Sequence, residues 1–375
     1  MSEADRPIGV DLFCGVGGMS LGFEQAGFHV QGAVDLDPIH VECYKGNFPG
    51  SSVVTGDISK LSGDVIRREA RLGNKQIDVV FGGPPCQGFS FMGKREADDP
   101  RNLLLGEFAR LVAELGPTYF VVENVAGLMA GPAKQVLARF IRLVRRAGYA
   151  VVEPVRVLAA EHFAVPQRRR RVFILGCKKG VQPPEYPSTH TGPWKEATPT
   201  VWDAIGDLPI IDEFPALLDS DVLHEPLGKP SAYAAVLRDD RREPDDASLP
   251  RDRNGRGLTG CMRTRHGAET IKRFAATLPG HCEPVSRFFR LAKDGLAPTQ
   301  RAGTGPSNGS FMAPRPIHPV HPRCVSVREA ARLHSFPDWF TFHATKWHAF
   351  RQIGNAVPPR LARAVAAVIA RCATK

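Results

Sequence analysis

Short apolar runs alternate with amphipathic stretches from residue 7 to about residue 177. The apolar runs have the length and composition of buried strands and cover 8–13, 30–34, 78–81, 119–122, 149–155 and 172–175. Stretches with helical spacing lie between them, among them 19–26, 103–115 and 134–147. Strands that alternate with helices predict an α/β fold, in which a mainly parallel sheet carries helices on both faces. Ligands of such folds bind beyond the carboxyl ends of the strands.

The pattern changes after Cys177, where the chain becomes rich in Pro and Thr and reads as a linker or irregular loop. Residues 239–246 are polar, and 251–273 hold seven basic residues against two acidic ones. Order returns near residue 325, where the pattern predicts a helix with Ser326 as its N-cap. A last helix is predicted over 357–370, with two prolines in its first turn. The two ends of the chain are therefore regular and the middle is irregular.

Length and composition narrow the classes of protein that this chain can represent. At 375 residues it exceeds one ordinary domain, so we expect two domains or one domain with a large insertion. The net charge of +10 favours an anionic partner, of which nucleic acid is the commonest. The eight cysteines form no C-x-x-C pair, which argues against a disulfide framework and a zinc knuckle and favours a reducing cytoplasm. The sequence begins without a signal-peptide pattern, and no apolar run approaches the ~20 residues of a membrane span.

The first motif with chemical meaning is the glycine-rich stretch DLFCGVGG at 11–18, which follows a strand and precedes a helix. Glycines let the backbone approach a ligand closely, and an acid about 20 positions downstream commonly holds ribose hydroxyls. Asp35 lies 20 residues after Gly15 and ends the second predicted strand. Ser20 stands where a dinucleotide motif would have its third glycine, so other adenosine cofactors are favoured. The alternative is a tight turn that binds no ligand.

The second motif is FGGPPCQGFS at 81–90, which follows another strand. Two prolines stiffen the chain before Cys86, and glycines flank the site. A rigid loop that presents a cysteine to a pocket suits nucleophilic catalysis, provided that the surroundings favour the thiolate. A buried structural cysteine in a proline turn is the alternative for this motif in isolation.

Taken together, the motifs resemble the DNA cytosine-5 methyltransferase family of the bacterial type. The resemblance rests on eight blocks in the family's order and spacing: DLFCGVGG, VDLDP, GDI, GGPPCQGFS, VVENV, QRRRRVF, VSVREAARLHSFP and RQIGNAVPPRLARAV. They cover about the first 177 and the last 50 residues. The resemblance implies a Rossmann-like domain that depends on S-adenosylmethionine, joined to a smaller, irregular target-recognition domain.

The resemblance also implies a reaction, because carbon 5 of cytosine is too weak a nucleophile to take a methyl group directly. Cys86 matches the family's nucleophile, which adds to carbon 6 of a cytosine flipped out of DNA. Glu123 matches the acid that holds ring nitrogen 3 and the amino group, and Asn124 would shape its turn. Arg169 matches a residue expected to contact the cytosine ring. Further substrate or DNA contacts are expected from Gln87, Ser90, Gln167 and Arg171, whereas Arg168 and Arg170 are read as solvated charges.

The residues that the resemblance assigns to the cofactor come from both ends of the chain. Those expected around S-adenosylmethionine are Phe13, Gly15, Gly17, Asp35, Leu36, Asp57, Ile58, Asn355 and Val357. Asp35 would hold the ribose hydroxyls, Leu36 would pack on the adenine, and Asp57 would accept its amino group. The last block must therefore fold back beside the first glycine loop.

The expected domains are a catalytic and cofactor-binding domain at 1–185, a target-recognition domain at 186–343, and a C-terminal segment at 344–375 that returns to the catalytic domain. Within the second, Arg263 and Arg265 belong to the basic stretch expected to touch DNA phosphates. His318, His321 and Cys324 have ligand-like spacing, but a proline-rich loop is the better interpretation, so no metal is expected.

Two alternatives share much of this pattern. A tRNA cytosine-5 methyltransferase has the same core but carries a Cys-Phe-Thr element that this chain lacks. A catalytically inactive DNA-binding relative would not need Cys86, Glu123 and Arg169 together. We expect a monomeric cytoplasmic enzyme that acts on double-stranded DNA, with a restriction endonuclease as a companion on the same site. The recognition sequence does not follow from the chain.

Overall fold

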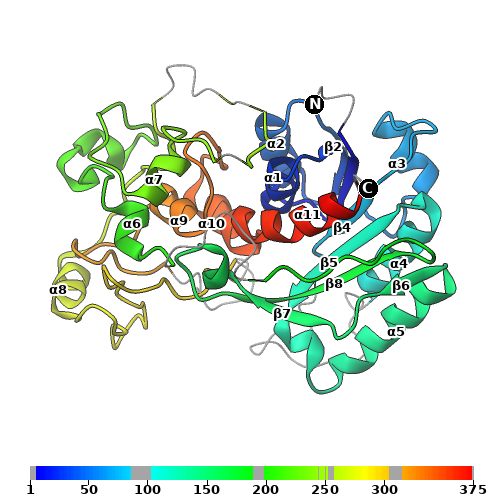
Figure 1. The fold of residues 1–375 in the computed structure, drawn as a ribbon. Coiled ribbons are helices and arrows are strands. Elements are labelled where there is room, and N and C mark those ends of the chain that lie inside the picture. The colour runs from blue at the N-terminus through cyan, green and yellow to red at the C-terminus, as the bar shows by residue number, and fades with distance from the viewer. Residues whose placement is uncertain are drawn as a thin grey trace.

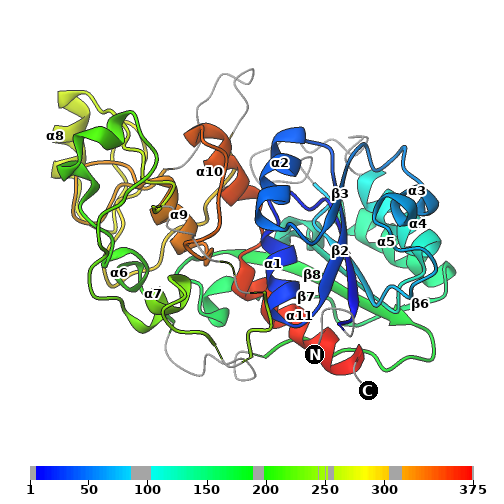
Figure 2. The same ribbon diagram turned by 90° about the horizontal axis from the view of Figure 1, so that it is seen from above.

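The computed structural model describes residues 6–85, 103–188, 198–243, 245–249, 251, 257–303 and 315–373. Figure 1 shows two lobes side by side, and the same division is seen from above in Figure 2. The two ends of the chain, blue to green and red, build the lobe with the sheet. The middle, light green to orange, builds the other lobe, while the last helix, α11 (Pro359–Ala373), lies against the first, α1 (Gly18–Gln25).

The larger lobe is organised around one sheet of eight strands in the order β3-β2-β1-β4-β5-β8-β6, with β7 also paired to β8. The strands are β1 (Ile8–Leu12), β2 (His29–Asp35), β3 (Ser52–Thr55), β4 (Val79–Gly82), β5 (Tyr119–Val125), β6 (Tyr149–Val151), β7 (Arg156–Ala159) and β8 (Arg170–Lys178). β1 to β5 are parallel, and β8 runs antiparallel to its three neighbours. The predicted mainly parallel α/β sheet is therefore confirmed.

One predicted strand, 149–155, is wrong in extent, because β6 ends at Val151 and β7 starts only at Arg156. Pro154 lies between them, and a proline has no N–H to donate to a neighbouring strand. β3 was missed by the sequence pattern, since it has only four residues and none of them is fully buried.

Helices cover both faces of the sheet, as predicted. α3 (Gly63–Glu69), α4 (Leu103–Leu115) and α5 (Ala133–Arg146) share one apolar core with the sheet. α1 and α11 share the other core, on the opposite face, and α2 (Pro38–Asn47) follows β2. The predicted bounds of α4 are confirmed, and those of α1 and α5 differ by one residue at each end.

The second lobe consists mainly of short helices and irregular segments within its described residues. Its helices are α6 (Val201–Ile205), η6 (Ile211–Glu213), η7 (Pro215–Leu218), α7 (Ala232–Leu237), α8 (Ala268–Ala276) and α9 (Val327–Leu333), and α10 (Lys346–Asn355) leads back to the sheet. Two further short 3-10 turns, η4 (Ala126–Met129) and η5 (Ala160–Phe163), belong to the first lobe. The predicted N-cap Ser326 is confirmed, and it forms a reciprocal capping box with Glu329.

The two lobes share a hydrophobic core, so they are not independent units. In one cluster Val16, Tyr44 and Phe48 of the first lobe pack with residues that include Leu291 and Phe340 of the second. Helix α9 lies in this core with every residue buried, and Arg332 within it is held by carboxylates of Asp207 and Asp338. The relative placement of the lobes is therefore fixed by packing as well as by chain connection.

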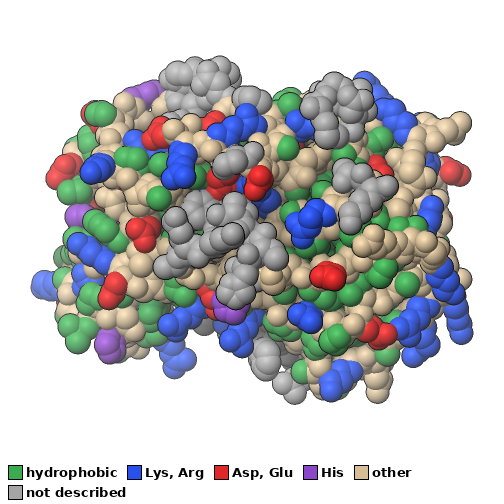
Figure 3. Space-filling model, in the orientation of Figure 1, with side chains coloured by type: hydrophobic (Ala, Val, Ile, Leu, Met, Phe, Trp, Pro, Cys, Tyr) green, Lys and Arg blue, Asp and Glu red, His purple; other side chains and the backbone are tan. Residues whose placement is uncertain are grey.

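The basic excess of the sequence is distributed over both lobes (Figure 3). On the first lobe, exposed Lys134, Arg139, Arg142, Arg145 and Arg146 line α5, which carries no acidic residue. None of the helices within the described ranges combines the length and the apolar character that crossing a membrane requires.

Candidate active site

The glycine loop between β1 and α1 adopts backbone conformations that explain its composition. Gly15 and Gly17 have φ values of 53° and 98°, and a Cβ atom on Gly17 would lie 2.2 Å from the Phe48 ring. Phe13 also has a positive φ, 68°, which is strained for a residue with a side chain. A Cβ placed on Gly15 meets nothing within 4 Å, so the loop borders open space there. The loop can therefore receive a ligand beside Gly15.

Asp35, the last residue of β2, is tied to this loop by hydrogen bonds. Its carboxylate accepts the backbone N–H groups of Gly15 at 2.8 Å and Asp37 at 2.9 Å. His40 on α2 places its Nδ1 atom 3.3 Å from the same carboxylate, a contact that no sequence signal indicated. The next side chain, Leu36, is 68% exposed although it is large and apolar. An exposed leucine beside an anchored carboxylate suits the planar base and the ribose of a nucleoside.

Asp57 follows β3 at the same edge of the sheet. Its Oδ1 atom accepts the N–H and the hydroxyl group of Ser59, and these hydrogen bonds lower the pKa of Asp57 below its ordinary value. The carboxylate therefore stays ionised and can accept a further donor such as an amino group. Ile58 beside it is buried and packs in the core under the sheet edge.

Asp11 in β1 is a further acid near the glycine loop that the sequence motifs did not single out. Its Oδ2 atom accepts the Ser20 hydroxyl at 2.6 Å, and Tyr44 in turn donates to Ser20. Its Oδ1 atom is buried and has no partner among the residues that the structure describes. Burial raises the pKa of Asp11 well above its ordinary value. A buried acceptor without a partner is the kind of group that a positively charged ligand would satisfy.

The last sequence block lies directly on the glycine loop. A Cβ atom on Gly18 would lie 2.5 Å from the carbonyl oxygen of Val357 and 3.0 Å from the Cβ of Ala356. Asn355 ends α10 and is exposed, whereas Val357 is buried. The predicted return of the C-terminal block to the first glycine loop is thus confirmed, across more than 300 positions of the sequence.

The loop that leads to Cys86 leaves the sheet at the end of β4, next to the end of β5. Cys86, Gln87 and Ser90 lie outside the described residues. Asn124 donates from Nδ2 to the carbonyl of Pro84 at 3.0 Å, and a Cβ on Gly83 would lie 3.1 Å from the Glu123 carboxylate. Asn124 therefore fixes the start of this loop beside Glu123, which agrees with its expected role in shaping the turn.

Glu123 is 8% exposed and forms an ion pair with Arg171, whose Nε atom lies 2.9 Å from its Oε1 atom. Burial raises the pKa of Glu123 above its ordinary value, and the charges of Arg171 and Arg169 oppose this rise. A buried carboxyl group with a raised pKa can hold a proton at a higher pH than an exposed one. The group is therefore suited to donate a hydrogen bond to a ring nitrogen and to stay anchored by Arg171.

Arg169, expected to contact the cytosine ring, and Gln167, expected to contact DNA, both have buried side chains in the structure. Arg169 is 1% exposed and donates to the carbonyl oxygens of Gln300, Gly354 and Ala356. Gln167 is 0% exposed, donates to the Leu333 carbonyl and accepts the Gln300 N–H. These two side chains join the lobes, and Arg171 is the arginine that contacts Glu123.

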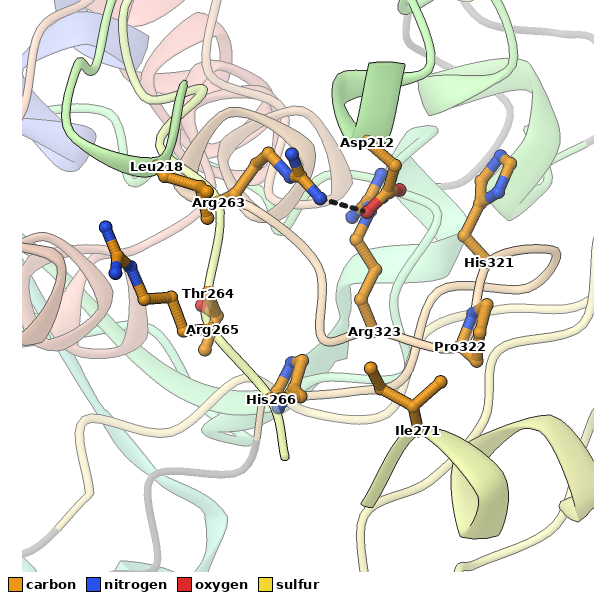
Figure 4. A pocket seen from close by; sticks show the side chains of 10 residues that line it. All are labelled: Asp212, Leu218, Arg263, Thr264, Arg265, His266, Ile271, His321, Pro322 and Arg323. Carbon is orange, nitrogen blue, oxygen red and sulfur yellow. Dashed lines mark hydrogen bonds and ion pairs between the residues drawn. The ribbon is translucent and has the colours of Figure 1, made fainter. Parts of the chain in front are cut away.

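Arg263 and Arg265, the two basic residues singled out in the middle of the chain, lie together on the second lobe at a pocket of about 450 Å³ (Figure 4). The other residues that line it are Asp212, Leu218, Thr264, His266, Ile271, His321, Pro322 and Arg323. They come from the stretches 212–218, 264–271 and 321–323, so nothing in the sequence pattern marks them as one site.

Ligand-like clusters for a metal are not found among the described residues. His318, which has suggestive spacing from His321, accepts the N–H groups of Val320 and His321 on its Nδ1 atom. All seven cysteines within the described ranges are free thiols.

Comparison with known proteins decides the family. A family model described as C-5 cytosine-specific DNA methylase matches residues 9–371. The chain belongs to this family. It is therefore a DNA (cytosine-5)-methyltransferase with S-adenosylmethionine as the methyl donor, as the sequence motifs implied. Nothing in the comparisons favours the tRNA enzyme or the inactive relative over this function.

Several relatives match over nearly the whole chain. The Type II methyltransferase M.XorII of Xanthomonas oryzae pv. oryzae is 51% identical over 99% of this chain and 86% of its own length. The Type II methyltransferase M1.HphI of Haemophilus parahaemolyticus is 34% identical, over 97% of this chain and 87% of its own. A solved E. coli structure, described as a DNA modification methyltransferase encoded within a prophage, has a TM-score of 0.81 and 33% identity. It covers 98% of this chain and 100% of its own.

Proposed function

We propose that this methyltransferase acts through a covalent adduct between Cys86 and carbon 6 of a flipped-out cytosine. The Cys86 thiolate would add to carbon 6 while protonated Glu123 donates to ring nitrogen 3, which shifts electron density toward carbon 5. S-adenosylmethionine, when bound, supplies the methyl group that carbon 5 accepts. Loss of the carbon 5 proton to a base would then expel the thiolate and restore the aromatic ring.

The observation that carries this proposal is the junction of β4 and β5. There, Asn124 holds Pro84, two residues before Cys86, while Glu123 faces Gly83 and pairs with Arg171. A nucleophile on this loop and the buried acid would therefore act on the same ring. Arg171 keeps Glu123 in place and is the arginine that we assign to the cytosine site, instead of the buried Arg169.

For the cofactor, we propose the residues at the carboxyl edge of β1, β2 and β3. Asp35 would accept the ribose hydroxyls, and Leu36 would cover one face of the adenine. Asp57 would accept the adenine amino group. Gly15 borders the open space for the methionine part. Asn355 and Val357 would close the site from the C-terminal side, next to Phe13, Gly17 and Ile58.

The residue boundaries 1–185, 186–343 and 344–375 remain our proposal for the catalytic, target-recognition and C-terminal parts. Relatives named Type II methyltransferases support the proposal that a restriction endonuclease with the same site accompanies this enzyme. We also propose that it acts as a monomer in the cytoplasm, where the DNA that it modifies is found.

The proposed adduct is tested by replacing the nucleophile and by trapping the complex. Cys86→Ala should abolish transfer of a radiolabelled methyl group and leave S-adenosylmethionine binding intact, because the thiol contacts cytosine and not the donor. DNA with 5-fluorocytosine at the target should give a shifted band on a denaturing gel, since fluorine cannot leave as a proton does.

The matched control is Cys282→Ala, which removes an exposed thiol of the second lobe and should preserve both activities. Methyl transfer by the Cys86 variant, or the absence of a shifted band with active enzyme, would remove Cys86 from the mechanism.

A further inference from the structure

The pocket on the second lobe (Figure 4) has the shape and the donors of an anion site. Arg263 and Arg265 stand on one edge, Arg323 on another, and α8 begins beside it with Ile271 in the wall. The N-cap of α8, Gly267, provides no side-chain cap for the first N–H groups of the helix. A concave surface with several cations and a helix N-terminus favours a phosphate group over the flat edge of a base.

The cations of the pocket differ in how firmly they are held. Arg323 is fully engaged, because Glu329 accepts from both of its terminal nitrogens at 2.8 Å and Asp212 accepts from Nε at 2.7 Å. Arg263 has only one carboxylate contact, to Asp212 at 3.4 Å. Arg265 pairs with Asp219, but both side chains are mostly exposed, and such pairs contribute little. The side chains of Arg263 and Arg265 can therefore rotate toward an incoming anion, while Arg323 stays paired with Asp212.

A further donor of the pocket is His266, whose protonation state is fixed by its surroundings. His266 accepts the N–H of Cys324 on Nε2 at 3.2 Å, and its ring packs edge-on against Phe274. Burial lowers the pKa of His266, and the nearby cations Lys346, Arg323 and Arg315 lower it further. The ring is thus neutral at neutral pH, and its proton lies on Nδ1 as a hydrogen-bond donor.

The pocket is connected to the proposed cytosine site by a single helix. At the start of α10, Lys346 donates to the Arg263 carbonyl at 2.6 Å. Directly after its end, the Ala356 carbonyl accepts from Arg169, two residues before Arg171, at 2.8 Å. Ten helical residues span about 15 Å. The helix therefore holds the pocket and the segment beside the proposed cytosine site at a fixed separation.

We propose that this pocket clamps one backbone phosphate of the DNA, at a fixed offset from the flipped cytosine, with Arg263 as its principal contact. The position of this phosphate is counted from the cytosine that reacts beside Glu123, so this inference rests on the proposed reaction. A clamp of this kind sets the register between the second lobe and the target base, whereas base contacts elsewhere choose the sequence.

The test neutralises single phosphates on the DNA and single charges on the protein. After bisulfite sequencing has located the target, duplexes carry one methylphosphonate at each successive position on both sides of the cytosine. For wild-type enzyme we expect one position at which binding weakens about tenfold or more. Arg263→Gln should weaken binding to unmodified DNA by a similar factor. A methylphosphonate at that position should then cause no further loss of binding in this variant.

Two further variants separate a specific contact from general charge or damage to the fold. Lys272→Gln removes one exposed cation from α8, next to the pocket but outside its lining, and should stay sensitive at the same position. Asp212→Asn should tighten binding, because Arg263 is released while Arg323 keeps Glu329.

The proposal is overturned if Arg263→Gln keeps the wild-type profile at every position, or if it changes the methylated sequence, which would indicate base reading. Wild-type protein that binds DNA but fails to methylate cytosine would instead contradict the proposed reaction.

Discussion

Gly18→Ala tests whether the two distant ends of the chain form one cofactor site. The added Cβ would lie 2.5 Å from the Val357 carbonyl oxygen, and ordinary contact requires about 3.4 Å, so the C-terminal block must move by about 0.9 Å. Overpacking of this kind costs about 1–3 kcal/mol, and the better helix propensity of alanine offsets at most about 1 kcal/mol. We expect a lower free energy of unfolding and about tenfold weaker S-adenosylmethionine binding, as Asn355 and Val357 are displaced.

The measurements are urea unfolding and calorimetry with S-adenosylmethionine. Gly46→Ala is the matched control: Gly46 lies exposed in α2 and a Cβ there meets nothing within 4 Å. That variant should be stabilised by about 0.5–1 kcal/mol and bind the cofactor normally. If Gly18→Ala unfolded at the wild-type urea concentration and bound the cofactor as tightly, the C-terminal block would not be packed on the glycine loop, and our cofactor site would be wrong.

Three further predictions concern the acids and the interlobe contacts. Glu123 must be protonated to donate a hydrogen bond, so kcat/KM should fall as pH rises through its raised pKa. Arg171→Gln removes a positive charge that lowers this pKa. In pH–rate profiles the variant should therefore lose activity at a higher pH than the wild type. An unmoved profile would exclude Glu123 as the titrating group. Asp57→Asn should weaken S-adenosylmethionine binding by about 1–3 kcal/mol in calorimetry. If the variant bound as tightly as the wild type, the adenine would not contact Asp57. Gln167→Ala should lower the urea concentration at which half of the protein is unfolded, without changing the salt dependence of DNA binding. A weaker salt dependence in the variant would instead indicate that Gln167 contacts DNA.

The sequence predicted most of the larger lobe, because its strands and helices carry strong periodic patterns. Helix α4 is an example, since its apolar residues recur at helical spacing and its predicted bounds are those observed. Elements with short or mixed patterns were missed, such as β3 and the helix α10. In α9 the helix was predicted, but its pattern gave no sign that Arg328 and Arg332 are fully buried. Their burial depends on Asp338 and on backbone carbonyls that only the tertiary fold brings near.

The motif residues at strand ends were also located well, because parallel strands bring their carboxyl ends to one edge of the sheet. This rule applies to Asp35 and Glu123, whereas Asp57 follows the unpredicted β3 and was assigned only by the resemblance to the family. The pocket on the second lobe could not be predicted in this way. Asp212 and His266 approach Arg263 through irregular segments, for which periodicity gives no information.

In the Gln-Arg-Arg-Arg-Arg run at 167–171, backbone geometry decides which side chains contact the protein interior and which are exposed to solvent. Burial alternates along this segment, which leads into β8: residues 167, 169 and 171 are buried or half-buried, and 168 and 170 are exposed. Arg168 and Arg170 are exposed, as expected for solvated charges. Of the other three, Gln167 bonds to the second lobe, Arg169 to the C-terminal block, and Arg171 to Glu123. One extended segment thus joins the proposed catalytic acid to both parts that must be placed around the DNA.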